Sequence, residues 1–312
     1  MANSKFRILT LNVRGLHEKQ KREQLFRWID DQNPQVTFLQ ETFCTENVIN
    51  DINASWEGKV FHSLTKSSHS RGVAILFSKS LNYEIINVIQ SEDGRKLLIN
   101  VKIENEVFSL VCAYAPNDER HRSLFLDILK KWVKKHAEND ENLIICADMN
   151  CCINDIDRYP RTHLKDKSRK IFKGMLDYLN VNDVWEYLNK EKPGFTYIDK
   201  RCNTKSRLDY ILVSKNCSYH SSKCYIMQAL NRDHKAVIHD FKLSNNKRGR
   251  GYWKFNNSLL DDDEYCLQLK GLIKAMPDIF PIDSKRLFWE LLKIKIKEFT
   301  ISYSIKKKIK IL

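Results

Sequence analysis

The sequence lacks long apolar runs, and it holds few glycines and prolines for its length. No apolar segment near Met1 has the form of a signal peptide, and no run reaches the roughly 20 apolar residues that a membrane-spanning helix needs. These absences argue against a secreted or membrane-spanning protein, so we expect an intracellular one. The 9 glycines and 6 prolines are few enough to leave the helices and strands long, and 42% hydrophobic residues among 312 argue against a disordered or fibrous chain.

Paired cysteine motifs are also absent. The nine cysteines are an odd number, and no two of them are spaced as Cys-x-x-Cys. Disulfide frameworks and structural zinc sites both need paired thiols, so this pattern argues against each of them. We therefore expect most of the cysteines to be small buried side chains of a hydrophobic core.

Positive charge is abundant, and it is unevenly distributed. The formal net charge is +14, and residues 247–312 hold 15 Lys and Arg against 8 Asp and Glu. Half of the positive excess therefore lies in the last fifth of the chain. A basic protein attracts polyanions, of which nucleic acid is the most common. The distribution favours a nucleic-acid partner over an evenly solvated surface.

Short strand-like runs alternate with amphipathic helical patterns up to about residue 243. The clearest helix covers 122–136, where apolar residues form one stripe and the lysines face away; 18–30 and 170–179 carry weaker versions. Many strands with few helices predict a four-layer α/β sandwich, in which two packed, mainly antiparallel sheets are flanked by helices. The predicted strands are 6–12, 36–40, 59–64, 72–78, 83–89, 96–103, 107–115, 142–147, 208–213 and 236–243.

The composition changes after residue 243. Residues 245–251 are basic and contain glycine, which indicates a domain boundary. We predict one domain over 1–243 and a basic, partly helical linker or tail over 244–312. The helical pattern around 284–299 is interpreted as too short to make a second core, so the tail is expected to lead into a larger protein or to dock on a partner.

Polar side chains stand where predicted strands end. Asn12 and Glu41 each end or follow a strand, and Asp148 and Asn150 follow a third. One such residue is more often a turn or helix cap, but the recurrence favours a site, because ligands and catalytic groups of α/β folds gather at strand ends. Carboxylate and amide oxygens suit Mg²⁺, with Mn²⁺ as a substitute, and phosphodiester hydrolysis needs such ligands.

Asp209 and His234 form a second predicted pair. Asp209 lies inside an otherwise apolar strand, where an unpartnered charge is costly. His234 precedes another apolar strand, and a carboxylate fixes the tautomer of an imidazole and supports its charged form. Taken alone, His234 is an ordinary core or surface histidine and Tyr114 a half-buried aromatic. Polar chemistry at several strand ends favours a functional interpretation.

These residues belong to an ordered series of motifs. The series reads Leu11-Asn12-Val13-Arg14-Gly15-Leu16, Leu39-Gln40-Glu41-Thr42, Arg71-Gly72-Val73-Ala74-Ile75-Leu76, Tyr114-Ala115-Pro116, Ala147-Asp148-Met149-Asn150, Arg207-Leu208-Asp209-Tyr210-Ile211 and Asp233-His234. Over residues 6–243 it resembles the endonuclease/exonuclease/phosphatase superfamily, and most of all the apurinic-type endonuclease domain at the N-terminus of LINE-type (non-LTR) retrotransposon polyproteins. The segment 251–260 is similar to the stretch that joins that domain to the reverse transcriptase.

The resemblance implies a metal site and a base. Glu41 would be the principal Mg²⁺ ligand, Asn12 would support the metal or its waters, and Asp233 would sit beside the metal. Asp148 would orient and activate the attacking water.

The resemblance also implies a set of phosphate contacts. Asn150 and Tyr114 would stabilise the charge that develops on phosphorus, while His234, held by Asp209, would contact the scissile phosphate. Thr196 matches a family position near the DNA backbone.

Three positions depart from the family pattern. Arg14 stands where repair-type members of the exonuclease III branch usually carry an acid, which weakens a DNA-repair interpretation. Ala147 replaces the usual glycine and adds one methyl group. Arg232 replaces the usual serine before Asp233-His234, so it would either bind phosphate itself or mark a decayed copy of low activity.

The leading hypothesis is therefore a Mg²⁺-dependent endonuclease that nicks double-stranded DNA and leaves a 3′-hydroxyl, as in target-primed reverse transcription. Two alternatives stay open: an abasic-site endonuclease and 3′-exonuclease, or a catalytically decayed nucleic-acid-binding module. We expect a monomeric nuclear protein whose tail also contacts RNA and which contacts no membrane. No Tyr/Phe-x-Asp-Asp motif of a reverse transcriptase is present, so the chain is interpreted as a fragment.

Overall fold

A computed structural model describes residues 5–64, 70–160, 166–230, 233–243, 255, 257–280 and 284–311. The chain divides into two compact units, Met1–Asn245 and Asn246–Leu312, and each is described by itself. The sequence indicates a domain boundary at residues 245–251, and the division between the two units falls there. These residues themselves lie outside the described ones.

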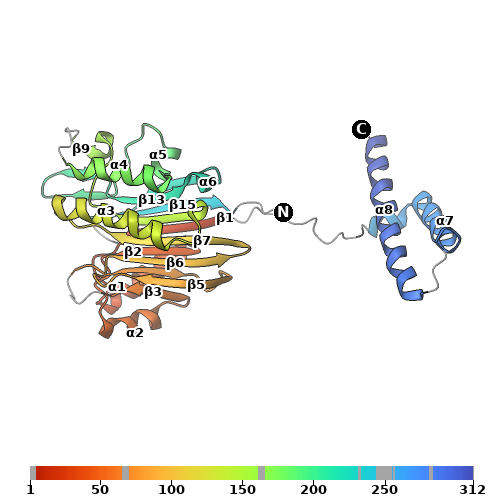
Figure 1. Ribbon diagram of the computed structural model, residues 1–312, viewed down its shortest axis with the longest axis horizontal. Helices are drawn as coiled ribbons and strands as arrows, with labels where there is room; N and C mark the ends of the chain where they lie inside the picture. Colours follow the sequence, from red (N-terminus) through yellow and green to blue (C-terminus); the bar gives the residue numbers. More distant parts are fainter. Residues whose placement is uncertain are drawn as a thin grey trace. The chain divides into compact units, whose positions relative to one another are not determined.

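Two six-stranded sheets form the first unit, and both are mainly antiparallel (Figure 1). In the first sheet the only parallel neighbours among its described strands are β1 and β2, and in the second sheet they are β7 and β8. The first sheet has the order β14 (Ser221–Met227), β15 (Ala236–Lys242), β1 (Lys5–Asn12), β2 (Val36–Gln40), β4 (Val73–Phe77), β3 (Lys59–Ser63). The second has the order β10 (Val181–Asp183), β13 (Asp209–Ser214), β8 (Leu143–Asp148), β7 (Glu106–Tyr114), β6 (Lys96–Ile103), β5 (Tyr83–Gln90).

The layers follow from where the apolar side chains point. Strands β2, β4, β8 and β13 are buried at every position, because they are covered on both faces. One core lies between the sheets, and two others lie under the helices. Figure 1 shows helices on both outer faces; they are α1 (Lys19–Gln32) and α2 (Glu46–Ser55) on the first sheet, and α3 (Glu119–His136) and α4 (Ser168–Leu179) on the second. The predicted four-layer α/β sandwich is confirmed.

Helix α3 shows why the sequence pattern succeeded. Its apolar stripe buries Phe125, Leu126, Leu129 and Val133 against the second sheet, and each such side chain contributes about 1.5–3 kcal/mol. The side chain of Asp118 caps its first turn, and Lys134, Lys135 and His136 lie in its last turn, where they complement the helix dipole.

All ten predicted strands are present, each within one residue of its predicted ends. The sequence did not predict the edge strand β14, which is polar at its start, or a small third sheet. That sheet has the order β11 (Tyr197–Asp199), β12 (Thr204–Ser206), β9 (Arg158–Tyr159), and its strands are too short to show a periodic pattern. Short helices η1 (Asp140–Asn142), η2 (Asp155–Asp157), α5 (Val184–Leu188) and α6 (Lys215–Ser218) complete this unit.

A buried ion triad anchors the start of β13. The guanidinium of Arg207 is almost fully buried and forms ion pairs with Asp157 and Asp183. The backbone of Arg207 also donates a hydrogen bond of 2.9 Å to the carbonyl of Asp157. The triad ties η2 and β10 to the segment that leads into Asp209.

The cysteines behave as the composition predicts. All nine are free thiols, and seven of them are buried. Cys202 is exposed in the turn that joins β11 to β12, and Cys266 on α7 is half-buried.

The C-terminal unit, predicted as a basic and partly helical tail, is a compact helical unit. It consists of η3 (Asn257–Asp261), α7 (Asp263–Ile279) and α8 (Lys285–Ile311). Tyr265 is fully buried between the two helices, and its hydroxyl lies 2.7 Å from that of Thr300. Helix α7, capped by Asp262, supplies the partner that α8 needs. None of the described helices combines the length and the apolar composition needed to cross a membrane.

Candidate functional site

The register of the second sheet aligns three predicted site residues. Asp148 ends β8, and its partner on the parallel strand β7 is Tyr114, which ends that strand. On the other side, the antiparallel strand β13 begins with Asp209 directly opposite Asp148. Tyr114, Asp148 and Asp209 therefore lie in a row across one end of this sheet.

The first sheet brings further residues to the same end. Asn12 ends β1, Glu41 follows β2, and His234 precedes β15. The two sets meet because the sheets pack face to face. The amide nitrogen Nδ2 of Asn12 donates hydrogen bonds of 2.8 Å to Oε1 of Glu41 and of 2.8 Å to Oδ2 of Asp148.

Asp209 and His234 form the predicted pair. Nδ1 of His234 lies 3.0 Å from Oδ2 of Asp209, and both side chains are buried. Burial alone would lower the pKa of His234, but the charge of Asp209 and the hydrogen bond to it outweigh burial and raise that pKa. The imidazole is therefore held in its charged form at neutral pH.

Asp148 joins this pair in a compact cluster. Ligand atoms of Asp148, Asp209 and His234 all lie within 4.8 Å of one another, and all three residues are buried. Burial, and next the charge of Asp209, raise the pKa of Asp148. Oδ1 of Asp209 is buried and accepts no hydrogen bond from any residue that the structure describes. A buried carboxylate oxygen with no donor, beside other carboxylates, suits a site that takes a cation.

Two predicted phosphate contacts lie beside this cluster. The backbone N–H of Asn150 donates to Oδ1 of Asp148 at 2.9 Å, and its side-chain amide donates to the carbonyl of Ala115 at 2.9 Å. Burial, and next the charge of Glu41, raise the pKa of Tyr114 far above its usual range. The Tyr114 hydroxyl therefore keeps its proton and serves as a hydrogen-bond donor.

The backbone around the site is unusually strained. Arg14, Glu41 and Asn150 all have left-handed backbone conformations, with φ of 48°, 52° and 48°. Non-glycine residues in this region are uncommon and gather at functional sites, where the surrounding fold holds them in place.

The remaining predicted residues have different surroundings. Arg14 forms an ion pair with Asp233, whose other carboxylate oxygen accepts a hydrogen bond of 3.0 Å from the backbone N–H of His234. Thr196 is fully buried, and its hydroxyl oxygen accepts hydrogen bonds from the backbone N–H groups of Leu208 at 2.9 Å and of Asp209 at 3.1 Å. Thr196 thus lies behind Asp209 rather than on the exposed surface. Arg232 lies outside the described residues.

Sequence reasoning missed Arg95. Its guanidinium carbon lies 5.0 Å from the centre of the Tyr114 ring, and its Nη1 donates to the carbonyl of Tyr114 at 3.0 Å. The structure reveals it through the register of the β6–β7 hairpin, in which Lys96 faces Ala113 and Arg95 therefore lies beside Tyr114.

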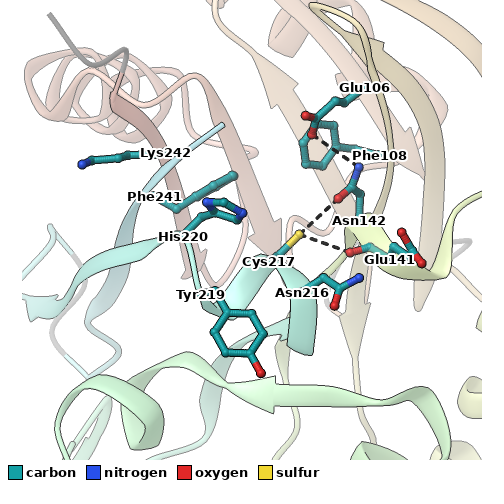
Figure 2. A pocket seen from close by; sticks show the side chains of 10 residues that line it. All are labelled: Glu106, Phe108, Glu141, Asn142, Asn216, Cys217, Tyr219, His220, Phe241 and Lys242. Atoms are coloured by element: carbon teal, nitrogen blue, oxygen red, sulfur yellow. Dashed lines mark hydrogen bonds between the residues drawn. The ribbon is translucent and has the colours of Figure 1, made fainter. Parts of the chain in front are cut away.

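A separate cavity of about 420 Å³ lies at the other end of the strands, near the start of β7 and the end of β15 (Figure 2). There the thiol of Cys217 donates to the carbonyl of Glu141 at 3.4 Å and to Oδ1 of Asn142 at 3.5 Å. Burial raises the pKa of Cys217, so this thiol is unreactive. This cavity is distinct from the acid-rich site.

A sandwich of two six-stranded sheets flanked by helices, with an acid-rich site at one end of the strands, defines the class of α/β protein to which the chain belongs. Residues 9–231 match the Endonuclease/Exonuclease/phosphatase family, and the chain belongs to that family. It is 29% identical over 308 residues to the transposon TX1 uncharacterized 149 kDa protein of Xenopus laevis. That match covers 95% of this chain and 23% of the relative, so the chain spans less than a quarter of the relative's length.

Solved structures show the same fold at low sequence identity. An AP endonuclease from Leishmania major has a TM-score of 0.63 at 19% identity, covering 77% of this chain and 88% of that one. An AP endonuclease from Archaeoglobus fulgidus has a TM-score of 0.60 at 20% identity, and the match covers 76% of this chain and 100% of that one. The endonuclease domain of TRAS1, a telomere-specific non-LTR retrotransposon, has a TM-score of 0.58 at 16% identity. That match covers 77% of this chain and 99% of the TRAS1 domain. The resemblance to retrotransposon endonucleases is confirmed.

Proposed function

We propose that the chain is a Mg²⁺-dependent endonuclease that nicks one strand of double-stranded DNA and leaves a 3′-hydroxyl. The observation that supports this most directly is the buried cluster of Asp148, Asp209 and His234, joined through Asn12 to Glu41. The cluster combines a candidate base, a charged imidazole and spare carboxylate oxygens, which are the groups that phosphodiester hydrolysis needs.

The residues present fit a hard divalent cation. Glu41 would hold Mg²⁺, or Mn²⁺ in its place, with support from the Asn12 amide. The carboxylates of Glu41, Asp148 and Asp209 outnumber the single imidazolium of His234, and one buried oxygen of Asp209 has no described donor. A cation bound there supplies Lewis-acid stabilisation of the negative charge on the phosphate. Asp233, which the resemblance places beside the metal, forms an ion pair with Arg14.

Asp148 is assigned as the base that takes a proton from the attacking water. Its raised pKa makes it a stronger base than an exposed carboxylate, and the hydrogen bonds from Asn12 and from the backbone of Asn150 fix its orientation. The water oxygen bonds to phosphorus as the bond to the 3′-oxygen breaks. That oxygen takes up a proton and becomes the 3′-hydroxyl.

Three donors surround the place where negative charge develops. His234 stays protonated beside Asp209 and contacts the scissile phosphate, while Tyr114 and Asn150 donate to the same group. Because these donors are held by strands and by hydrogen bonds, little reorganisation accompanies the reaction. Thr196 contacts no phosphate but positions Asp209, because its hydroxyl accepts a hydrogen bond from the backbone N–H of Asp209.

The small third sheet supports DNA as the substrate. Tyr197 on β11 forms a backbone bridge with His234, so the β11–β12 hairpin adjoins the site. Exposed Lys200 and Arg201 stand in its turn, and Lys205 lies over the ring of Tyr159 at 5.6 Å. A cationic hairpin next to the site complements the phosphates of a duplex.

Nicking of supercoiled plasmid, with and without EDTA, tests this proposal. We expect Mg²⁺-dependent conversion to open circles whose ends a DNA polymerase extends without further treatment, because the product carries a 3′-hydroxyl. An Asp148→Asn protein is the matched control, with its circular dichroism spectrum compared with that of the parental protein. Binding of the plasmid without any Mg²⁺-dependent cleavage would instead support the decayed binding module.

Cleavage at abasic sites is the second candidate function, because two of the similar structures are AP endonucleases. The ion pair between Arg14 and Asp233 argues against it, since repair-type members usually carry an acid at position 14. Comparing the nicking rates of one duplex with and without an abasic site separates the two functions. Equal rates favour the nicking endonuclease, and a strong preference for the abasic duplex favours repair.

A further inference from the structure

A second cavity, of about 550 Å³, opens beside Tyr114. It lies between the end of β7, the turn before β6 and helix α3, and it is lined by Arg71, Arg95, Lys96 and His121 as well as by Tyr114. None of these residues other than Tyr114 has a part in the proposed chemistry. The cavity is therefore adjacent to the catalytic groups but not made of them.

The acidic residues of this cavity are already engaged. Oδ1 of Asp93 accepts from the hydroxyl of Ser91 at 2.6 Å and from the backbone of Arg95 at 3.1 Å, and it lies 3.6 Å from the Lys96 ammonium. Oδ1 of Asp118 caps α3 by accepting a hydrogen bond from the backbone N–H of His121. The ring nitrogen Nδ1 of His121 lies 2.8 Å from the same oxygen. Each carboxylate thus serves the local structure.

The two arginines, Arg71 and Arg95, have no carboxylate in direct contact within the described residues. The charges of Asp93 and Glu41 act on Arg95 only from further away. Burial, and next the positive charge of Arg71, lower the pKa of Arg95. Two like charges that face one cavity repel each other unless an anion lies between them.

The backbone holds the arginines in place despite this repulsion. The N–H of Gly72 donates to the carbonyl of Gly94 at 2.9 Å, which joins the loops that carry Arg71 and Arg95. Arg71 itself has a left-handed φ of 67°, a conformation that costs free energy for a non-glycine residue. Arg95 is fixed over the Tyr114 ring.

From this arrangement we infer that Arg71 and Arg95 form a binding position for a second phosphate of the nucleic-acid strand, next to the phosphate that is cut. Guanidinium groups match phosphate in shape and charge. Tyr114 both lines this cavity and stands beside Asp148 in the proposed catalytic site. Leu124 and Ile128 on α3 line the cavity and are 61% and 46% exposed, which provides an apolar wall for the sugar between the two phosphates. This inference rests on the proposed function for the identity of the strand.

Equilibrium binding of a labelled DNA duplex in EDTA tests the inference without any cleavage. Arg71→Gln removes the charge and keeps a polar side chain, and because Arg71 is exposed we expect the fold to be retained. We expect roughly tenfold weaker binding, and a slope of log affinity against log salt that is shallower by about 0.9, the value for one lost phosphate contact. The matched control is Arg27→Gln, an exposed arginine of α1 remote from this cavity, which removes the same charge.

A duplex with a single uncharged methylphosphonate, moved along the strand, locates the contact. At one position next to the nick it should weaken binding by the parental protein and leave binding by Arg71→Gln unchanged. Equal effects of Arg71→Gln and Arg27→Gln would overturn the inference, as would methylphosphonate losses of the same size in both proteins. If inorganic phosphate stabilises the protein but Arg71→Gln leaves the duplex affinity unchanged, the cavity binds free phosphate and not the DNA strand. That outcome would also overturn the inference. Failure of plasmid nicking alone counts against the proposed chemistry and leaves this binding position untouched.

Discussion

Asn12 donates a hydrogen bond of 2.8 Å to Asp148, a residue 136 positions further along the chain. Asn12 ends a strand of the first sheet and Asp148 ends a strand of the second, so this bond forms only when the two sheets have packed face to face. The same nitrogen also donates to Glu41. The site and the core between the sheets are therefore completed together.

Replacing Asp148 by Asn should separate chemistry from binding. The substitution keeps the size of the side chain and removes the charge that accepts the water proton. We expect plasmid nicking to fall by roughly two to four orders of magnitude, while duplex affinity stays within about threefold of the parental value. Rates and affinities measured side by side check this, and an Asp148→Asn protein that nicks at the parental rate would remove Asp148 from the mechanism.

Glu41→Ala should change the metal requirement instead. The substitution deletes a hard anionic ligand but leaves the proposed base in place, so half-maximal nicking should need roughly tenfold more Mg²⁺. A Mg²⁺ titration of the nicking rate measures this. The double variant with Asp148→Asn should lose far less than the product of the two single losses, because both residues serve one transition state. Independent, multiplying losses would contradict that coupling.

The buried triad around Arg207 should dominate local stability. Arg207→Met leaves the carboxylates of Asp157 and Asp183 buried without their partner, so the free energy of unfolding should fall by about 3–5 kcal/mol. Urea unfolding measures the loss. The control is Lys79→Met, which breaks an ion pair of Lys79 with Glu57 in which both side chains are exposed, and it should leave the unfolding midpoint unchanged.

His239 should make the protein sensitive to acid. Burial lowers its pKa to about 4 from an ordinary value of 6.5. As the pH falls below 6.5, His239 binds a proton in the unfolded chain but stays neutral in the folded protein. The free energy of unfolding therefore decreases between pH 6.5 and about pH 4. The loss between pH 7 and pH 5 should be about 2 kcal/mol smaller for His239→Gln than for the parental protein. Exposed His220→Gln is the control, and an equal acid response in all three proteins would contradict this assignment.

The basic C-terminal unit should strengthen DNA binding without supplying catalytic groups. A protein that ends at residue 243 should unfold cooperatively, because the three cores of the sandwich lie within 1–243. It should bind duplex more weakly and with a shallower salt dependence, since residues 247–312 carry 15 Lys and Arg against 8 Asp and Glu. Calorimetry and a salt titration check the two parts. An unchanged salt slope would assign the C-terminal unit to another partner.

The sequence predicted those parts of the fold whose signal is local. Strands β2 and β8 are mainly apolar and buried at every position because both faces are covered, and the acidic residue that follows β2 or ends β8 marks the site. The C-terminal helix α7 was missed because only Tyr265 and Met276 of its side chains are buried, and they are eleven residues apart. Two buried side chains so far apart produce no periodic pattern.

The identities of the site residues were likewise easier to predict than their contacts. Nothing near Asn12 in the sequence shows that its amide bridges Glu41 and Asp148, because that depends on how two sheets pack. The same holds for Arg14, whose partner Asp233 lies on a different segment at the far end of the domain sequence. Arg95 became visible only through the register of β6 and β7.

The burial of the cysteines makes the β11–β12 turn a selective place for a fluorescent label. Seven thiols are buried, and Cys266 is half-buried on α7, so a maleimide dye should react first with Cys202 in the unsubstituted protein. The hairpin that carries Cys202 forms a backbone bridge with His234 through Tyr197. A dye at Cys202 would lie in the turn of the hairpin that adjoins the proposed catalytic site, and a change in its emission would report the binding of a DNA duplex in real time.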